Sequence, residues 1–232
     1  DRLSRGLGDV YKRQMNEQVE RDVMEYDVLI IGGGPSGLSS AIKVKQLASA
    51  EGKDVSVCVL EKGSEIGAHI LSGNVFEPTA LNELIPDWKE KEAPLNSPAT
   101  KDIVKFMISE NSSFNIPFPS FLIPTFNNHG NYVMSLANFT RWLATQAESL
   151  GVEIFPGFTA AEVIFEENVV KGVLTGEMGI SKDGEKKPSY QPSMELRGKY
   201  TVFAEGCRGH LGKQLIKKFN LDENRDPQHY GI

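Results

Sequence analysis

The sequence predicts an α/β protein that combines a parallel βαβ core, an antiparallel strand layer and an irregular cap insertion. Residues 26–60 alternate a buried strand, a helix and a second buried strand. Residues 161–177 have the pattern of two antiparallel strands joined by a short turn. Between these two regions, residues 67–130 lose regular patterning because prolines recur along them.

The βαβ core begins with residues 26–31, a short β-branched and apolar run that is typical of a buried parallel strand. Residues 36–50 follow as a helix, with Pro35 at its entry, where a missing N–H leaves no hydrogen bond unmade. Residues 55–60 then form a second buried strand. Because such crossovers are right-handed, we expect the two strands to be parallel neighbours.

The insertion at residues 67–130 is too apolar for a linker, and only residues 79–84 and 102–109 resemble short elements. Its first part carries apolar side chains that suit either shallow insertion into a membrane or packing in the core. These side chains are Phe76, Leu81, Leu84, Ile85 and Trp88.

The later elements alternate strands and helices. A helix with an apolar stripe is expected to stop at Gly151, and a polar stretch with two prolines predicts an exposed loop. In order, these elements are the strand 132–136, the helix 138–150, the strands 152–155, 161–166 and 169–177, the loop 181–193, the strand 201–204 and the helix 209–219.

Composition narrows the functions that remain. The chain has 232 residues, of which 40% are hydrophobic and 24% are charged, as in ordinary soluble globular proteins. Its net charge of −6 argues against a nucleic-acid partner. Its two cysteines, Cys58 and Cys207, cannot form a four-thiolate metal site or a C-x-x-C redox pair. No metal site is therefore expected in this chain, and redox chemistry would need an organic cofactor.

The sharpest motif is G-G-G-P-S-G at residues 32–37, which fits G-x-G-x-x-G between a predicted strand and a predicted helix. Gly32 permits the tight turn, Gly34 lets backbone N–H groups approach a pyrophosphate, and Gly37 allows close packing of helix on strand. The second strand ends at Glu61, an acidic residue placed to accept hydrogen bonds from a ribose and to repel a 2′-phosphate. The alternative is a glycine-rich turn that binds no ligand.

The order of the later elements favours FAD over a nicotinamide cofactor. A simple nicotinamide dehydrogenase would continue as a doubly wound sheet, whereas here an insertion, a helix and antiparallel strands intervene. A second glycine turn at residues 203–209 returns a strand to the sheet and starts a helix; on its own it is also compatible with an ordinary strand–helix turn. The sequence thus predicts an FAD-binding Rossmann-like fold of the glutathione-reductase type.

The chain resembles the electron-transfer flavoprotein:ubiquinone oxidoreductase family over essentially all of residues 26–232. The resemblance rests on five runs: VLIIGGGPSGLSSAIKVKQLA (28–48), VCVLEKGSEIGAHILSGNVFEP (57–78), PDWKEKEAPLNSP (86–98), NNHGNYV (127–133) and FAEGCRGHLGKQLIKKFNL (203–221). Within them, the blocks 61–73, 86–98 and 127–133 are specific to that family, whereas the G-x-G-x-x-G motif is shared by many flavoproteins.

The resemblance implies an FAD enzyme that takes electrons from reduced electron-transfer flavoprotein and passes a pair to ubiquinone. Its place would be the surface of the inner membrane, on the cytoplasmic face in bacteria or in mitochondria of a eukaryotic homologue, with peripheral, monotopic contact. Electron transfer requires no catalytic acid–base pair. FixC-like or geranylgeranyl-reductase-like FAD oxidoreductases share the FAD frame and are an alternative, and an inactive FAD-binding fragment is another.

The resemblance also implies which residues bind the cofactor. The glycine turn would hold the pyrophosphate, the end of the second strand the adenosine ribose, a following loop the isoalloxazine, and a later strand the adenine. In that order, these residues are Gly32, Gly33, Gly34, Pro35, Ser36 and Gly37; Glu61 and Lys62; Gly67, Ala68, His69, Leu71, Ser72 and Gly73; Ala160; and, in the second FAD turn, Glu205 and Gly206.

The sequence is expected to be a fragment. Residues 1–14 precede the first methionine and resemble a non-native leader, and residues 15–232 would form an incomplete FAD-binding domain whose cap or membrane-proximal insertion spans about 67–130. The family's four-iron four-sulfur cluster, quinone pocket and late Gly-Asp flavin motif would lie in the missing C-terminal part.

Overall fold

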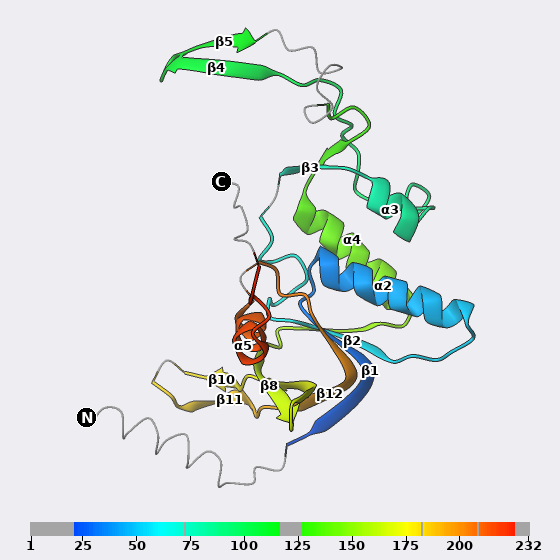
Figure 1. The fold of residues 1–232 in the computed structure, drawn as a ribbon, viewed down its shortest axis with the longest axis vertical. Coiled ribbons are helices and arrows are strands. Elements are labelled where there is room, and N and C mark those ends of the chain that lie inside the picture. The colour runs from blue at the N-terminus through cyan, green and yellow to red at the C-terminus, as the bar shows by residue number, and fades with distance from the viewer. Residues whose placement is uncertain (1–20, 72, 117–126, 182, 208, 226–232) are drawn as a thin grey trace.

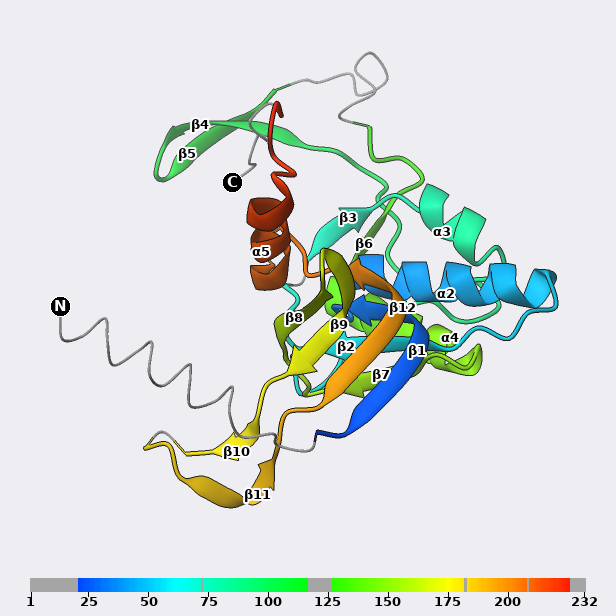
Figure 2. The ribbon, with the colours of Figure 1, turned by 60° about the horizontal axis from the view of Figure 1, so that its bottom comes forward.

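A computed structural model describes residues 21–71, 73–116, 127–181, 183–207 and 209–225. The expected leader at residues 1–14 lies outside these described ranges. The fold is built around one six-stranded mixed sheet, in the order β7-β2-β1-β12-β9-β8 (Figures 1 and 2). Its strands are β1 (Val23–Ile31), β2 (Val57–Glu61), β7 (Glu153–Pro156), β8 (Ala160–Glu166), β9 (Val169–Thr175) and β12 (Glu195–Phe203).

Four of these strands form the parallel part of the sheet. β1 pairs in parallel with β2 and with β12, and β2 pairs in parallel with β7. β9 joins the edge of β12 in the antiparallel direction and forms a hairpin with β8. The predicted βαβ neighbours and the predicted antiparallel layer are therefore confirmed.

One face of the parallel strands is covered by α2 (Pro35–Ala50) and α4 (Leu136–Ser149), which lie side by side (Figure 1). Ile30 of β1 and Val59 of β2 pack against Leu38 and Ile42 of α2 and Leu143 of α4, all fully buried or nearly so. Gly151 follows the end of α4 with φ of +79°, the left-handed conformation expected of a helix stop.

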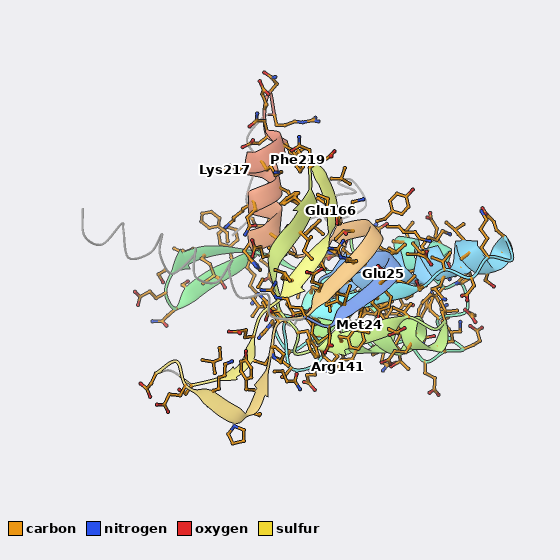
Figure 3. All side chains as sticks on the ribbon, turned by 90° about the horizontal axis from the view of Figure 1, so that it is seen from below. Met24, Glu25, Arg141, Glu166, Lys217 and Phe219 are labelled. Carbon is orange, nitrogen blue, oxygen red and sulfur yellow. The ribbon has the colours of Figure 1, made fainter. Side chains whose placement is uncertain are left out.

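The other face carries a second apolar cluster beneath α5 (His210–Phe219). Leu211 of α5 is completely buried against side chains of this face, among them Leu29 and Leu60. At the far end of the helix, the centre of the Phe219 ring lies 6.1 Å from that of Phe165 in β8. Figure 3 labels Phe219 on α5 and Glu166, the residue after Phe165, on β8. The helix thereby fixes the position of the second glycine turn that precedes it.

The insertion contains more regular structure than its sequence suggests. The expected short element at residues 79–84 is a helix, α3 (Thr79–Leu84), and β3 (Asn74–Phe76) pairs with β6 (Tyr132–Met134). β4 (Val104–Ser109) and β5 (Ser112–Ile116) form a hairpin that projects from the rest of the protein (Figure 1). β3 and β5 are too short or too exposed to show a clear alternation of apolar and polar residues.

The prediction of a loop at residues 181–193 is wrong in part. β10 (Met178–Ile180) pairs with β11 (Lys186–Gln191) in the antiparallel direction. The Tyr190 hydroxyl donates to Glu177 at 2.7 Å, and the Lys186 ammonium lies 3.9 Å from the Tyr190 ring centre. These side-chain contacts help to join the two strands, and the polar sequence of β11 has no apolar alternation that would predict it.

The apolar residues between Phe76 and Trp88 pack in the core, so they do not form the exposed face that membrane insertion would need. Leu81, Ile85 and Trp88 are 3%, 3% and 5% exposed, and Phe76 and Leu84 pack against the same cluster. The Trp88 indole N–H donates to Asn82 at 2.7 Å, which satisfies the polar edge of the buried ring. Among the described residues, no helix is long and apolar enough to cross a membrane.

Candidate functional site

A cavity of about 720 Å³ opens where β1, β2 and β12 end side by side. Ile31 is paired with Leu60 on one side and with Phe203 on the other, so the turns that follow these strands meet at one edge of the sheet. Ligands of open α/β sheets bind at the carboxyl ends of the strands, and this volume lies within the range of small-molecule sites.

The first glycine turn forms the part of the wall between β1 and α2. Gly32 has φ of +111°, and its N–H donates to the Leu60 carbonyl at 2.8 Å. A side chain at Gly32 would collide with the Ala204 carbonyl, and one at Gly37 with the Gly32 carbonyl. Both glycines are therefore needed to bring the two turns and the helix into contact, as the motif predicts.

Gly34 differs from these two glycines because the space in front of it is open. A Cβ atom there would meet no atom within 4 Å, and its φ of −81° and ψ of 179° suit any residue. Gly34 is also the N-cap of α2, which has no side-chain cap and no acidic residue in its first turn. The N–H groups of this first turn are thus available to an anion in the cavity.

Glu61 ends β2 and is held by the two glycine-containing loops next to it. One carboxylate oxygen, Oε2, accepts from the Gly33 N–H at 2.9 Å, and Oε1 accepts from the Gly63 N–H at 2.7 Å. Each carboxylate oxygen can accept a second hydrogen bond, so these contacts are compatible with a ribose hydroxyl pair at the same group. The sequence did not reveal that Glu61 also fixes the shape of the first glycine turn.

The second glycine turn closes the opposite wall and precedes α5. The side chain of Glu205 is only 11% exposed, and its Oε2 accepts from the Gly212 N–H at 2.8 Å. Gly206, with φ of +76°, lies at the surface of the same wall. The parallel pairing of β1 with β12 brings this turn beside the first one, as predicted.

Most residues predicted to bind the cofactor line this one cavity. They are Gly32, Gly33, Gly34, Pro35, Ser36, Glu61, Lys62, Gly67, His69, Ala160, Glu205 and Gly206. Four others do not line it: Gly37 packs α2 against β1, Ala68 and Gly73 are exposed, and the Leu71 side chain is 92% exposed. Ser72 lies outside the described residues.

The sequence missed several apolar and aromatic wall residues. Leu136 begins α4, and Phe158 and Thr159 connect β7 to β8. The sequence shows only that these residues lie next to the ends of strands or helices. It does not show that they lie near the glycine turns, because the fold brings them there. The others are Ile31, Leu60, Ile70, Phe203, Ala204, Gly209 and His210.

The cysteines lie where the sequence predicts. Cys58 is buried in β2, and burial raises the pKa of its thiol to about 12, with the nearby Glu153 carboxylate adding to the effect. Cys207 is exposed in the second glycine turn. Within the part of the chain that the structure describes, no group of three or more His, Cys, Asp or Glu side chains could hold a metal ion.

Comparison with known proteins agrees with this geometry. Residues 30–85 match the model of the NAD(P)-binding Rossmann-like domain family. A geranylgeranyl bacteriochlorophyll reductase-like protein from Thermoplasma acidophilum superposes with a TM-score of 0.57 at 22% identity, covering 82% of this chain and 42% of that one. The predicted Rossmann-like α/β fold is confirmed.

Two curated relatives carry the name electron transfer flavoprotein-ubiquinone oxidoreductase. The chain is 59% identical to the protein from Pseudomonas aeruginosa over 217 residues, which are 92% of this chain. It is 49% identical to the mitochondrial protein from Homo sapiens over 97% of its length. It spans only 39% and 36% of these relatives, in their N-terminal parts. The predicted resemblance to this group, and the prediction that the chain corresponds to an N-terminal fragment, are confirmed.

Proposed function

We propose that this chain is the FAD-binding, N-terminal part of an electron transfer flavoprotein–ubiquinone oxidoreductase. The single observation that carries the proposal is 59% identity over 92% of the chain to a relative of that name. The site supports it independently, because an open glycine turn, an uncapped helix N-terminus and an acidic strand end surround one cavity. The whole protein would transfer electrons from reduced electron-transfer flavoprotein to ubiquinone.

The residues present fit FAD. The diphosphate would occupy the empty space in front of Gly34 and accept from N–H groups of the first turn of α2, while Glu61 would accept from the adenosine ribose with Lys62 beside it. Ala160 would offer its backbone to the adenine. Gly67 and His69, which line the cavity, would lie beside the isoalloxazine, and Gly206 would belong to the second turn around the cofactor.

FAD, when bound, would supply the ability to exchange both single electrons and electron pairs. The chain's own part in this chemistry is to bind, orient and shield. Leu136, Phe158 and Phe203 give the cavity an apolar lining, which would limit the access of water to the cofactor. A four-iron four-sulfur cluster, which the two cysteines here cannot hold, would reside in the part of the whole protein that this chain does not span.

The whole protein provides the test of this activity. It should reduce a soluble ubiquinone analogue when reduced electron-transfer flavoprotein is the only electron donor. The Gly34→Val variant, matched in expression and folding, should lose this activity together with its flavin. A flavin-containing protein that reduced no quinone from this donor would leave FAD binding intact but contradict the proposed reaction.

An inactive FAD-binding fragment remains the second candidate for the chain by itself, because it spans 39% of its relative. Purified chain that retains or takes up flavin absorbance without quinone reduction would support it. The likeness to a geranylgeranyl-reductase-like protein, at 22% identity, concerns the fold alone and does not favour that activity.

We also propose that the β4–β5 hairpin mediates peripheral contact with a membrane, the inner membrane of a bacterium or of a mitochondrion. The hairpin projects from the body of the protein (Figure 1) and carries exposed apolar side chains on both of its strands. The Phe106 and Phe114 rings are cross-strand partners with centres 5.5 Å apart. The exposed apolar residues of this hairpin region are Ile103, Phe106, Met107, Ile108 and Phe114.

Introducing a charge on this hairpin should weaken the membrane contact. In Phe106→Asp, the carboxylate would oppose burial at the lipid surface, and we expect the fraction of whole protein that floats with phospholipid vesicles to fall several-fold. Val169→Asp is the matched control, because Phe106 and Val169 are both 54% exposed and Val169 lies on β9, away from the hairpin. Equal flotation of both variants and the unaltered protein would contradict this assignment.

A further inference from the structure

Two helix N-termini border the cavity, and they differ in how their N–H groups are satisfied. α2 begins at Gly34 and Pro35 with no side-chain cap and no acidic residue in its first turn. α5 begins at Gly209 and His210, which also line the cavity, but a carboxylate accepts from two of its N-terminal N–H groups, those of Leu211 and Gly212. Both ends would otherwise attract an anionic group, since helix N-termini carry partial positive charge.

Glu205 supplies that carboxylate from the second glycine turn. Its Oε2 accepts from the Gly212 N–H at 2.8 Å, and its Oε1 lies 3.4 Å from the Leu211 N–H. The His210 Nδ1 lies 3.4 Å from the same Oε1. With its side chain only 11% exposed, Glu205 is held on α5 and is not free to follow a ligand.

The surrounding backbone is shaped to receive this side chain. A Cβ atom on Gly209 would lie 2.5 Å from the Glu205 Cβ and 2.7 Å from Oε2, so only glycine leaves room for the carboxylate there. At Gly212, Oε2 is also the nearest neighbour to an added Cβ, at 3.6 Å. Because 3.6 Å is an ordinary contact distance, Gly212 is not required for space, and Gly209 at the N-cap of α5 is the glycine that leaves room for Glu205.

We propose that Glu205 is a positioning residue that closes the N-terminus of α5 to anions and thereby directs the dinucleotide's diphosphate to α2. A carboxylate on the α5 amides uses their hydrogen-bonding capacity and repels a second negative charge. At the α2 end, the Glu61 carboxylate accepts from the Gly33 N–H, which precedes the helix, while the first turn has no side-chain cap and the space in front of Gly34 is empty, so this end can accept a diphosphate. This role rests on the proposed FAD function and replaces a direct contact between Glu205 and the cofactor.

Backbone amide NMR of the 232-residue chain, titrated with inorganic pyrophosphate as probe, tests this role. In the unaltered protein, the Ser36 and Gly37 amides should shift with pyrophosphate while those of Leu211 and Gly212 remain unchanged. In Glu205→Ala, the Gly212 amide proton should move upfield before any addition, because its hydrogen bond is lost. Both α5 amides should then shift saturably with pyrophosphate.

Two further variants complete the experiment. Glu205→Gln keeps the side-chain volume, so it tests the same role if the alanine variant fails to fold. Its α5 amides should respond to pyrophosphate more than those of the unaltered protein and less than those of Glu205→Ala. Glu148→Gln, which removes one exposed carboxylate from α4, should leave the α5 amides silent. This control shows that the response does not arise from net charge alone.

The outcomes separate this role from the proposed function. A pyrophosphate response at Leu211 and Gly212 in the unaltered protein, or silence of both amides in both Glu205 variants, would overturn the role of Glu205. Silence of Ser36 and Gly37, with a response at α5 in Glu205→Ala, would instead support the closure of α5 while counting against diphosphate binding at α2.

Discussion

Three glycines of the first turn have different physical tasks, which can be told apart by what an added side chain would touch. At Gly32 and Gly37 it would collide with backbone carbonyls, whereas at Gly34 it would enter empty space. The first two are therefore required by the fold. Gly34 is required only if a ligand comes close to it.

Gly34→Val should separate ligand binding from folding. Its backbone angles suit valine, so replacing glycine at the N-cap should change the free energy of unfolding by only about 1 kcal/mol. Bound flavin should nevertheless be lost, because the side chain fills the space proposed for the diphosphate. Gly37→Ala is the contrasting control, and overpacking should cost it about 1–3 kcal/mol. Chemical denaturation with flavin absorbance measures both effects, and a flavin-replete Gly34→Val protein would remove this turn from the site.

Glu61→Gln tests the acidic end of β2. Glu61 accepts from the Gly33 N–H with one carboxylate oxygen and from the Gly63 N–H with the other. Glutamine replaces one of these oxygens with an NH₂ group, so the side chain loses its negative charge and one hydrogen-bond acceptor. Hydrogen bonds to charged groups contribute about 1.5–3 kcal/mol, so FAD affinity should fall by about one to two decades. Glu162→Gln, at an exposed position of β8, is the matched control for a fluorescence titration. Equal affinity of the two variants would place the ribose elsewhere.

Among the elements, β1 is tied to both of its parallel neighbours through Asp27. Its Oδ2 accepts from the N–H and the hydroxyl of Ser56, just before β2, at 2.8 and 3.0 Å. Its Oδ1 pairs with the Lys199 ammonium of β12 at 2.5 Å. The hydrogen bond with Lys199, followed by those with Ser56, lowers the pKa of Asp27 to about 2.

This lowered pKa predicts a specific pH dependence of stability. A carboxyl with a pKa lower in the folded state stabilises the fold above its unfolded pKa of about 3.9 and loses this contribution as pH falls toward its folded value. Asp27→Asn should therefore be less stable than the unaltered protein near neutral pH, and the difference should shrink between about pH 4 and pH 2. Urea denaturation across this range measures the difference; a constant gap would show that Asp27 does not titrate as described.

The elements that sequence patterns predicted well are those whose burial is complete along their length. β2 is buried at Val57, Cys58, Val59 and Leu60, and the apolar run makes it visible. β12 begins at Glu195, earlier than residue 201, because Val23 of β1 pairs with Glu195 across the sheet and Arg197 forms ion pairs with Glu195 and Glu166. Such long-range pairing of polar residues leaves no periodic signal in the local sequence.

The sequence predicted part of the candidate site, as it predicted part of the fold. The motif spacing located the glycine turns and Glu61, since their chemistry follows from the local order of strand, turn and helix. It did not reveal that Glu61 holds the Gly33 N–H or that Glu205 caps α5, because both depend on side-chain directions set by the fold. The wall residues Leu136 and Phe158 became visible only once α4 and the β7–β8 connection were in place.

At the scale of the whole molecule, the chain combines a well-packed Rossmann-like core with an apolar surface whose described residues pack against no part of that core. It spans 39% of the length of its Pseudomonas aeruginosa relative. The sheet and its helices form the candidate cofactor cavity, whereas the exposed apolar β4–β5 hairpin lies outside it and is the surface that we propose for membrane contact. FAD binding is therefore the proposed property that can be tested with this chain alone.

Titration of the chain with FAD, followed by flavin fluorescence, tests the central claim most directly. The unaltered protein should saturate at one FAD per chain, and NADP-type dinucleotides with a 2′-phosphate should not displace it, because Glu61 would repel that group. Gly34→Val should show no saturation under the same conditions. No saturable binding by the unaltered chain, or equal binding by the variant, would contradict the claim that this cavity is an FAD site.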